Sequence, residues 1–399
     1  MKILHILYQS VPQISGSSIR SRDILMTQKE VGMDVVAITA PFQAATSNFD
    51  IIDGIKYYRS KFNEKDTISD KRKSLGSRIL RLFSIFSFYN EIKKIIIIEK
   101  PNVLHAHAMF FCGIPALLLA KKYKVPFVYE VRSLWMLKKE KKKTSKISDL
   151  IERLLFKTEC FVMKKANQVV VINENLKQVI VNSGVPSDKI VLINNAVNTT
   201  LINKLKDIDA VKERDEVRFG YIGTLTPHEG IDMLIEAFNI FNLKHPKSRL
   251  IIFGCGIEEE RISQLAQGNN KIDFKGKIDP NEVYKAFNAI DIIVNPRYKN
   301  KLTDSVTPLK PLEAMAYSKL VIGSDVGGIK ELVKHEKNGF LFSSGSVKEL
   351  VKTMEYVVNL DLKRVKEVKV GALNYVQNQK SWLNNASIYH KNYQNLINE

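Results

Sequence analysis

Cysteine is scarce in the 399 residues, with three positions that lie far apart: Cys112, Cys160 and Cys255. Their odd number and wide spacing argue against a disulfide framework and against a cysteine-based zinc site. This usage favours a reducing, cytoplasmic compartment. No run of about 18 apolar residues occurs, so no transmembrane helix is expected, and the N-terminal apolar stretch is too short for a signal peptide. Any membrane contact is therefore expected to be peripheral.

Acidic residues are also few beside basic ones, 42 against 61, and the formal net charge is +19. Such an excess favours an anionic partner, such as a nucleic acid, an acidic membrane surface or a phosphorylated substrate. A lysine-rich composition of the whole proteome would produce the same excess. Neither zinc-finger spacing nor an aromatic RNA-binding motif accompanies the charge, so a nucleic-acid partner is not expected. A basic nucleic-acid- or membrane-binding protein is the alternative from another functional class.

Short apolar runs alternate with helical patterns along the chain, and this alternation is typical of doubly wound α/β domains. The length exceeds what one hydrophobic core usually supports. We therefore predict two Rossmann-like domains, at residues 1–198 and 217–375, joined by a polar linker at 199–216. Residues 376–399 are predicted to form a helix that crosses back to the first domain. Strands are expected at 3–8, 35–39, 103–106, 127–131, 169–172 and 190–193, then at 217–222, 250–253, 272–274, 290–294 and 320–322.

Two glycine turns follow strands of the predicted second domain. Gly223 comes after 217–222, and the sequence Phe-Gly-Cys-Gly places Gly254 and Gly256 after 250–253. Ligands of open α/β sheets bind at the carboxyl ends of the strands, where glycine lets the backbone approach them closely. Glycine turns after strands are common, so neither turn alone specifies a ligand.

The segment from Thr307 to Gly328 carries the most information. Pro311 suits the first turn of a helix, and the residues before it would offer backbone N–H groups to a diphosphate. Lys310 adds a positive charge there, and Glu313 is placed to accept hydrogen bonds from ribose hydroxyls. Alternatively, Glu313 only complements the helix dipole, which is worth ~0.3–1 kcal/mol.

Together these three elements resemble family 4 of the glycosyltransferases, in the branch found in bacterial exopolysaccharide and capsule gene clusters. The resemblance implies the GT-B fold, two Rossmann-like domains facing across a cleft, and transfer of a sugar from a nucleotide-diphosphate donor with retention of anomeric configuration. It assigns catalytic roles to His107, Lys310 and Glu313. Together with the positions of these residues in the sequence, it leads us to expect donor contacts from Gly16, Arg132, Gly223, Thr224, Gly254, Arg297, Thr307, Pro308, Leu309, Lys310 and Glu313, and acceptor contacts from Ser17, Arg20, His105 and Trp135.

Several of these residues have simpler explanations. His105 and His107 alternate onto one face of a strand end, which favours a functional role over a structural one. Trp135 would equally suit core packing, and Arg20 and Arg22 would equally suit a solvated helix face. Two Lys/Arg positions that contact the donor in many family members hold Thr224 and Glu229 here, and a further carboxylate position holds Ser305. Arg132 and Arg297 are the cations expected to compensate.

The resemblance also implies the partners. The expected co-substrate is a nucleotide sugar, most simply a UDP-sugar, without a cofactor or a metal, because Lys310 and backbone N–H groups can stabilise the leaving diphosphate. The Asp207-Ile-Asp209 sequence falls in the linker and is treated as incidental. The acceptor is expected to be a saccharide or lipid-linked saccharide. A nucleotide-sugar epimerase is the enzymatic alternative, although no pair of acid/base carboxylates supports it. Residues 71–88 mix basic and apolar side chains, as either an anionic membrane surface or an ordinary core-facing helix would require.

Overall fold

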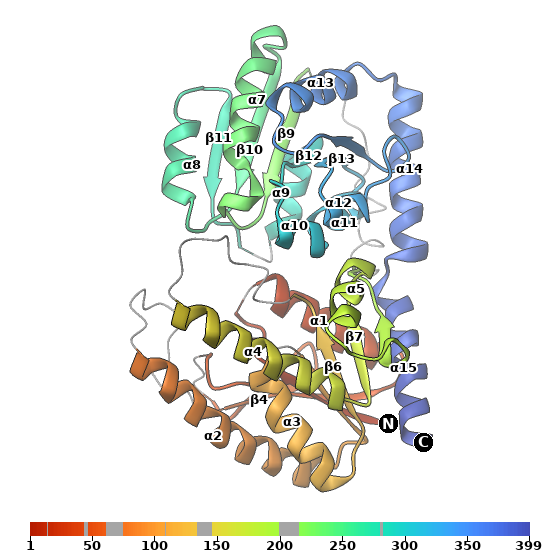
Figure 1. Cartoon of the computed structure of the whole chain (residues 1–399). Coiled ribbons are helices and arrows are strands. Elements are labelled where there is room, and N and C mark those ends of the chain that lie inside the picture. Colours follow the sequence, from red (N-terminus) through yellow and green to blue (C-terminus); the bar gives the residue numbers. More distant parts are fainter. Residues whose placement is uncertain are drawn as a thin grey trace. The chain divides into compact units, whose positions relative to one another are not determined.

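The computed structural model describes residues 1–13, 15–43, 47–60, 75–107, 109–133, 146–198, 215–279 and 282–399, with side chains left undescribed at 75–83, 146–149 and 152. Trp135, Asp207, Asp209 and most of the predicted linker lie outside these ranges. The chain forms two compact units (Figure 1). Unit 1 comprises Met1–Asn194 and Trp382–Glu399, and unit 2 comprises Asn195–Ser381.

Unit 1 is built on an eight-stranded sheet in the order β3-β4-β2-β1-β5-β6-β7-β8. All neighbouring strands are parallel except β3 and β4, which form an antiparallel hairpin. The central strands β5 and β6 are buried along their whole length. The strands are β1 (Lys2–Leu7), β2 (Asp34–Thr39), β3 (Phe49–Ile52), β4 (Ile55–Arg59), β5 (Val103–His107), β6 (Phe127–Val131), β7 (Gln168–Val171) and β8 (Ile190–Leu192).

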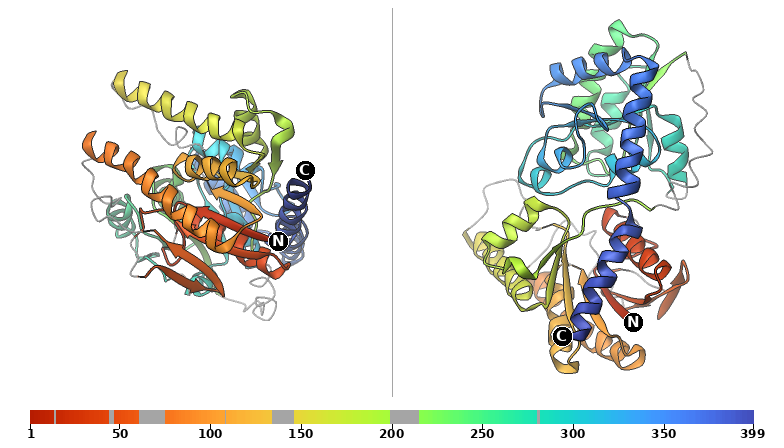
Figure 2. Two further views of the ribbon diagram at one scale, coloured as in Figure 1. Left: turned by 90° about the horizontal axis from the view of Figure 1, so that it is seen from below. Right: turned by 90° about the vertical axis from the view of Figure 1, so that its right-hand side faces the viewer.

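Helices cover both faces of this sheet, as the alternation of side chains on β6 demonstrates. Tyr129 points to one face and donates to Glu159 of α4, whereas Glu130 points to the other and accepts from Tyr389 of α15. α3 packs against both α2 and α4, while α15 packs against α1 (Figure 2). The helices are α1 (Gly16–Glu30), α2 (Leu75–Glu99), α3 (Phe110–Tyr123), α4 (Lys146–Lys165), α5 (Glu174–Asn182) and α15 (Trp382–Asn398).

Unit 2 contains a fully parallel six-stranded sheet in the order β11-β10-β9-β12-β13-β14. Its strands are buried on both faces, because Leu250 and Ile252 of β10 pack in one apolar cluster and Ile251 in another. The strands are β9 (Val217–Ile222), β10 (Ser248–Phe253), β11 (Ile272–Gly276), β12 (Ile292–Asn295), β13 (Leu320–Ser324) and β14 (Phe340–Phe342).

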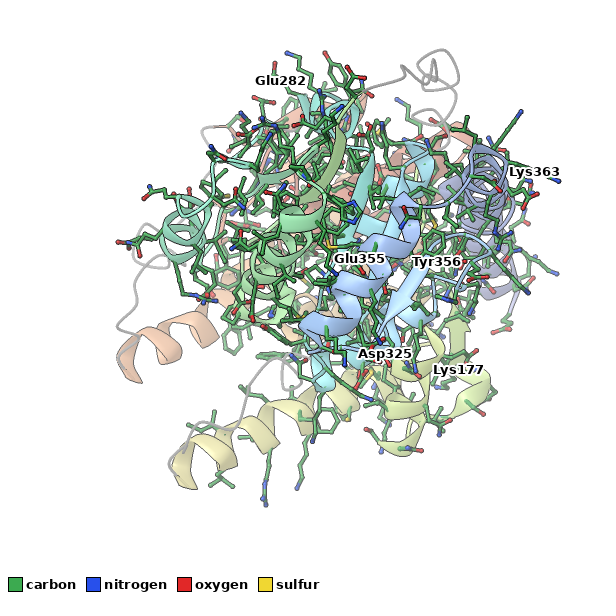
Figure 3. All side chains as sticks on the ribbon, turned by 90° about the horizontal axis from the view of Figure 1, so that it is seen from above. Lys177, Glu282, Asp325, Glu355, Tyr356 and Lys363 are labelled. Carbon is green, nitrogen blue, oxygen red and sulfur yellow. The ribbon has the colours of Figure 1, made fainter. Side chains whose placement is uncertain are left out.

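The helices of unit 2 follow the same alternation. α13 lies along α7 and carries Glu355 and Tyr356 toward solvent (Figure 3). The helices are α7 (Ile231–Lys244), α8 (Glu259–Ala266), α9 (Val283–Ala289), α10 (Lys301–Ser305), α11 (Lys310–Ala316), α12 (Gly327–Lys330), α13 (Val347–Val358) and α14 (Leu362–Gln379). None of the described helices of either unit combines the length and apolar character that a bilayer span requires.

The predicted fold class, two Rossmann-like α/β halves, is confirmed. Every predicted strand is present within about two residues, but β3, β4 and β14 were not predicted. The β3–β4 hairpin turns at Asp53 and Gly54, both with positive φ. An Asp-Gly pair between two apolar runs is a strong hairpin signal, so the sequence did contain the information for this element.

Candidate active site

In unit 2, the ammonium of Lys310 lies directly over the glycine turn that follows β9. A Cβ atom on Gly223, whose φ is +152°, would lie 2.2 Å from Cε of Lys310. The Lys310 ammonium also lies 4.4 Å from the ring centroid of Tyr221 and donates to its hydroxyl. The Tyr221 hydroxyl in turn donates to the carbonyl of Thr224 at 2.9 Å. Glycine at 223 is therefore what allows Lys310 to approach the end of β9.

The second glycine turn packs against the first. A Cβ on Gly254 would lie 2.2 Å from the carbonyl oxygen of Gly223, and one on Gly256 would lie 2.3 Å from that of Leu225. The backbone N–H of Gly223 donates to Phe253 at 2.9 Å. The two turns thus form one backbone surface at the carboxyl ends of β9 and β10, with Lys310 beside it.

Glu229 forms ion pairs with two cations. Its carboxylate lies 3.0 Å from Nζ of Lys310 and 2.7 Å from a guanidinium nitrogen of Arg297. Burial alone would raise the pKa of Glu229, but Lys310 and Arg297 outweigh that effect and hold the pKa well below its ordinary value. Burial lowers the pKa of Lys310, and Glu229 partly offsets this. Together the three side chains carry one net positive charge.

Glu313 lies one helical turn after Lys310, on α11. Burial raises the pKa of its carboxyl group, and Lys310 opposes the rise. Leu309 precedes α11 without a side-chain cap, and Thr307 is held by the amide of Asn195, which donates to its carbonyl at 2.7 Å. Behind this segment a Cβ on Gly328 would lie 2.2 Å from the carbonyl oxygen of Val306. The residues from Thr307 to Gly328 therefore form one packed segment.

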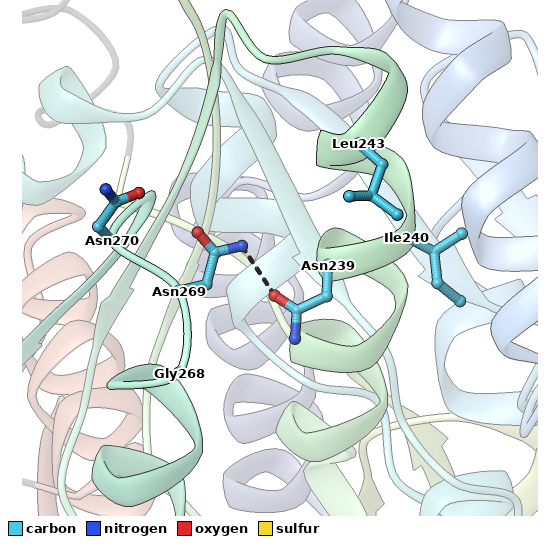
Figure 4. Close-up of a pocket in the computed structure, with 6 residues that line it drawn as sticks. All are labelled: Asn239, Ile240, Leu243, Gly268, Asn269 and Asn270. Carbon is cyan, nitrogen blue, oxygen red and sulfur yellow. Dashed lines mark hydrogen bonds between the residues drawn. The ribbon is translucent and has the colours of Figure 1, made fainter.

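A different pocket lies elsewhere in unit 2 (Figure 4). Asn239, Ile240 and Leu243 line it from the end of α7 opposite to Gly230, and Asn269 donates to Asn239 at 2.9 Å. Nine residues of helix separate Asn239 from Gly230, about 13 Å along the axis. The described residues that line this pocket include no titratable side chain, so we do not assign chemistry to it.

In unit 1, the ends of β5 and β6 bring together buried histidines and charges. Glu130 is fully buried and accepts from Arg20 at 3.1 Å and from Arg132 at 2.8 Å. Arg132 also lies 2.5 Å from Nδ1 of His107. Burial would raise the pKa of Glu130, yet the two arginines and the histidines beside it keep that pKa well below its ordinary value. The carboxylate is therefore the anionic centre of this cluster.

His5, on β1, joins the two predicted histidines. His5, His105 and His107 are all buried, and their ring nitrogens lie within 4.8 Å of one another, which is close enough to hold a metal ion. Burial lowers the pKa of each. However, the two positive charges of Arg20 and Arg132 already exceed the one negative charge of Glu130. Adding a divalent cation to a buried cluster with a net positive charge costs free energy. The charges of this cluster thus disfavour a metal.

Two family models match almost the whole chain. The model described as Glycosyltransferase Family 4 matches residues 32–201, and that described as Glycosyl transferases group 1 matches residues 203–394. The chain belongs to family 4 of the glycosyltransferases. Two uncharacterized glycosyltransferases of Methanocaldococcus jannaschii are 27% identical over 59% of this chain and 23% identical over 85% of it, covering 60% and 84% of their own lengths.

This glycosyltransferase also resembles a named relative in sequence and solved structures of other proteins in fold. The capsular polysaccharide biosynthesis glycosyltransferase CapM of Staphylococcus aureus is 24% identical over 52% of this chain and 56% of its own. Sucrose-phosphate synthase from Thermosynechococcus elongatus shares the fold, with a TM-score of 0.79 at 18% identity and 99% coverage of both chains. HepE from Anabaena, solved with UDP and glucose, has a TM-score of 0.70 at 16% identity and 99% coverage of both.

Against this family pattern, unit 2 of the glycosyltransferase brings together Gly223, Thr224, Gly254, Arg297, Thr307 and Lys310, with Pro308, Leu309 and Glu313 on the same segment. Glu229, which the sequence identified only as a departure from the pattern, is the anion that holds Lys310 and Arg297. Its spacing from Gly223 was visible in the sequence, but its pairing with Arg297 was not.

Unit 1 of the glycosyltransferase brings together Arg20, His105, His107 and Arg132, with Ser17 accepting from Arg132 at 2.7 Å through its carbonyl. Arg20 is 2% exposed and lies over the Trp382 ring at 4.7 Å, so a solvated helix face is the wrong explanation for it. Gly16 is exposed in open space at the start of α1. The sequence did not predict the contributions of His5, Gln28, Glu130, Tyr389 and Tyr393.

Proposed function

We propose that this glycosyltransferase moves a sugar from a nucleotide-diphosphate donor, a UDP-sugar, to a hydroxyl of a saccharide or lipid-linked saccharide in surface-polysaccharide synthesis, with retention of anomeric configuration. Family membership supports sugar transfer. The relative CapM, named for capsular polysaccharide biosynthesis, supports a role in surface-polysaccharide synthesis. The presence of UDP and UDP-glucose in HepE structures supports a UDP-sugar as the donor.

The observation that carries the donor assignment is Lys310 packed on Gly223. Sugar transfer releases a diphosphate, and negative charge grows on that leaving group as the bond to the sugar breaks. A partly buried ammonium beside the glycine turn stabilises such charge because it is already oriented before the reaction. Lys310 would therefore meet the leaving diphosphate, and we propose that the reaction needs no metal. Glu313 would accept hydrogen bonds from the ribose.

On the acceptor-side unit, we propose that His107 meets the transferred sugar. Nδ1 of His107 lies against a guanidinium, which only donates hydrogen bonds. This nitrogen therefore acts as an acceptor. A sugar hydroxyl that replaced Arg132 there would donate to it, and Arg132 would become available to a phosphate or an acidic acceptor.

The test is a screen of nucleotide sugars for thermal stabilisation, because a ligand that binds only the native state raises the unfolding temperature. The donor with the largest effect is then offered saccharide and lipid-linked acceptors, and the anomeric configuration of the product is read by NMR. We expect stabilisation by a UDP-sugar and a retained configuration. Epimerisation of the donor without acceptor would instead support the epimerase alternative, and an inverted product would contradict retention.

We further propose that the enzyme works at the inner face of the cell membrane, through a surface that we call the basic–apolar face. It consists of the exposed described side chains of α2, α3 and α4, and none of these is acidic. Leu150 and Leu154, at 68% and 63% exposure, lie one turn apart on α4. Its large apolar and basic members are Phe86, Lys94, Ile97, Ile98, Leu118, Lys121, Lys122, Leu150, Arg153, Leu154, Lys157, Phe161, Lys164 and Lys165.

A surface with both apolar and basic side chains fits an anionic lipid interface, because apolar groups enter the acyl boundary while each lysine or arginine gains about 1 kcal/mol. Flotation with phosphatidylglycerol vesicles should therefore recover the protein, whereas phosphatidylcholine vesicles should not. Leu154→Gln should weaken binding. Leu243→Gln, at a position 85% exposed on unit 2, is the control. Equal binding to both vesicles, or a shift of DNA at physiological salt instead, would contradict the proposal.

A further inference from the structure

The buried cluster of unit 1 is a ring of polar side chains, which we call the histidine ring. Hydrogen bonds form its links except between His105 and Glu130, where Nε2 lies 3.5 Å from the carboxylate without a hydrogen bond. Its links come from five elements, β1, α1, β5, β6 and α15. In order around the ring, the links are Arg132 to Nδ1 of His107 (2.5 Å), His107 to His5 (2.9 Å), His5 to Gln28 (2.8 Å), Gln28 to Tyr393 (3.2 Å), Tyr393 to His105 (2.6 Å), His105 to Glu130 (3.5 Å) and Arg132 back to Glu130 (2.8 Å).

Two members of the histidine ring fix its direction. The guanidinium of Arg132 has no acceptor, and the ionised carboxylate of Glu130 has no donor. Nδ1 of His107 must therefore accept, which places its proton on Nε2 and directs that proton to Nδ1 of His5. The donor and the acceptor of each following hydrogen bond are then fixed in the same order around the ring.

The rest of the assignment follows from the same rule. Nε2 of His5 donates to the carbonyl oxygen of Gln28, whose amide nitrogen donates to the Tyr393 hydroxyl. That hydroxyl donates to Nδ1 of His105, which leaves the His105 proton on Nε2, facing the carboxylate. A reversed chain would turn a histidine proton toward the guanidinium and a lone pair toward the carboxylate, both of which are repulsive in a buried site.

We propose that Gln28 and Tyr393 are positioning residues, which hold His107 as a neutral imidazole with its Nδ1 lone pair toward the sugar-side end of β5. The assignment of the Nδ1 atom to a sugar hydroxyl rests on the proposed function. The assignment of the histidine tautomers does not depend on that function. Neither Gln28 nor Tyr393 touches the reacting groups, so they act through His5 on one side and His105 and Glu130 on the other.

The groups that face this site come from every packed element. His5 lies on β1, Arg20 and Gln28 on α1, His105 and His107 on β5, Glu130 on β6, Arg132 just after β6, and Tyr389 and Tyr393 on α15. Burial keeps the pKa of all three histidines below the ordinary value. They should therefore stay neutral to a lower pH than a solvated histidine does.

The direct test is nitrogen NMR of the histidine rings in the full chain, which contains seven histidines. His5, His105 and His107, assigned by single His→Gln variants, should each carry the proton on Nε2 at neutral pH. Tyr393→Phe removes the hydroxyl that donates to Nδ1 of His105 and should shift the nitrogen resonance of that atom. Unchanged nitrogen spectra in Tyr393→Phe would overturn the proposal.

Tyr389→Phe is the matched control, because Tyr389 is on the same buried helix face and donates to Glu130 without being a link of the histidine ring. It should leave the nitrogen resonance of His105 Nδ1 unchanged. If Tyr393→Phe does not fold, Gln28→Leu breaks the neighbouring link and should shift the Nε2 resonance of His5.

The kinetic test uses whichever donor and acceptor the screen identifies. Tyr393→Phe should lower kcat about tenfold or more while the donor KM stays within about twofold, because orientation rather than donor affinity is lost. An unchanged kcat together with a shifted His105 resonance would remove the positioning role. If no donor is turned over by the wild type, the proposed function fails while the tautomer result still decides the direction of the ring.

Discussion

Nζ of Lys310 lies 3.0 Å from Oε2 of Glu229, while the same carboxylate lies 2.7 Å from Arg297. One buried anion thus holds two cations at the carboxyl ends of the unit 2 strands. The ion pair with Glu229 keeps Lys310 oriented before the donor binds. Because Arg297 is a second cation, the three side chains together keep a net positive charge. Such preorganisation is what stabilisation of a leaving diphosphate requires.

Lys310→Met should abolish most turnover without unfolding the protein. The methionine keeps an apolar side chain over Gly223, and Glu229 keeps Arg297 as its partner. We expect kcat to fall about 100-fold or more, the magnitude typical of losing one preorganised electrostatic contact. Steady-state kinetics and thermal unfolding measure the two properties. Lys363→Met, at an exposed position of α14, is the control, and equal rates for the two variants would remove Lys310 from the mechanism.

Gly223→Ala should displace Lys310. The added Cβ would lie 2.2 Å from Cε of Lys310, at a φ of +152° that alanine rarely adopts. The strain should cost about 1–3 kcal/mol of unfolding free energy, and turnover should fall because the ammonium moves. Gly345→Ala separates the effect of backbone strain from the effect of the clash with Lys310. Gly345 has a φ of +80°, but nothing lies within 4 Å of a new Cβ there. A loss of turnover as large in Gly345→Ala as in Gly223→Ala would show that the clash with Lys310 is not responsible.

Glu229→Gln should destabilise the protein by about 3 kcal/mol, because it leaves two buried cations without their anion. The double variant Glu229→Gln with Arg297→Met should recover part of that loss, since one uncompensated charge is removed. Denaturant unfolding of both single variants and the double variant gives the coupling free energy. Glu355→Gln provides the comparison. Its pair with Lys244 is exposed (3.2 Å), so we expect a change below about 1 kcal/mol. If the changes in unfolding free energy of the two single variants simply added up in the double variant, a shared buried pair of Glu229 and Arg297 would be contradicted.

Glu159 should make unit 1 less stable as the pH rises. Burial raises its pKa to about 7, although Tyr129 and the backbone of Phe110 donate to it. The unfolded carboxyl titrates near its model value of 4.5, so between about pH 4.5 and about pH 7 the folded state binds more protons than the unfolded state. The unfolding free energy should therefore fall by about 3 kcal/mol across this window and then level off.

Glu159→Gln should remove this slope, because the amide remains neutral at every pH. The informative quantity is the difference in unfolding free energy between the wild type and the variant, measured from about pH 5 to about pH 8. That difference should grow in favour of the variant as the pH rises. A constant difference would mean that Glu159 is ionised throughout, like an ordinary surface carboxyl group.

The sequence by itself determined the fold class and the segment that carries Lys310 and Glu313. Strand and helix periodicity are local properties, and the order of apolar runs, glycine turns and Pro311 is read directly along the chain. The Asp53–Gly54 hairpin was readable in the same way, although it was not predicted. The catalytic assignments came from this order together with the family resemblance.

Only the tertiary structure decided which charges neutralise one another. Glu229 and Arg297 are 68 residues apart, and His5, His105 and Tyr393 come from β1, β5 and α15. No periodicity relates such positions, because their distances depend on how parallel strands are ordered in the sheet and on where the last helix packs. Burial then sets their protonation, since each ionisable group must find its partner within the fold to offset its loss of water.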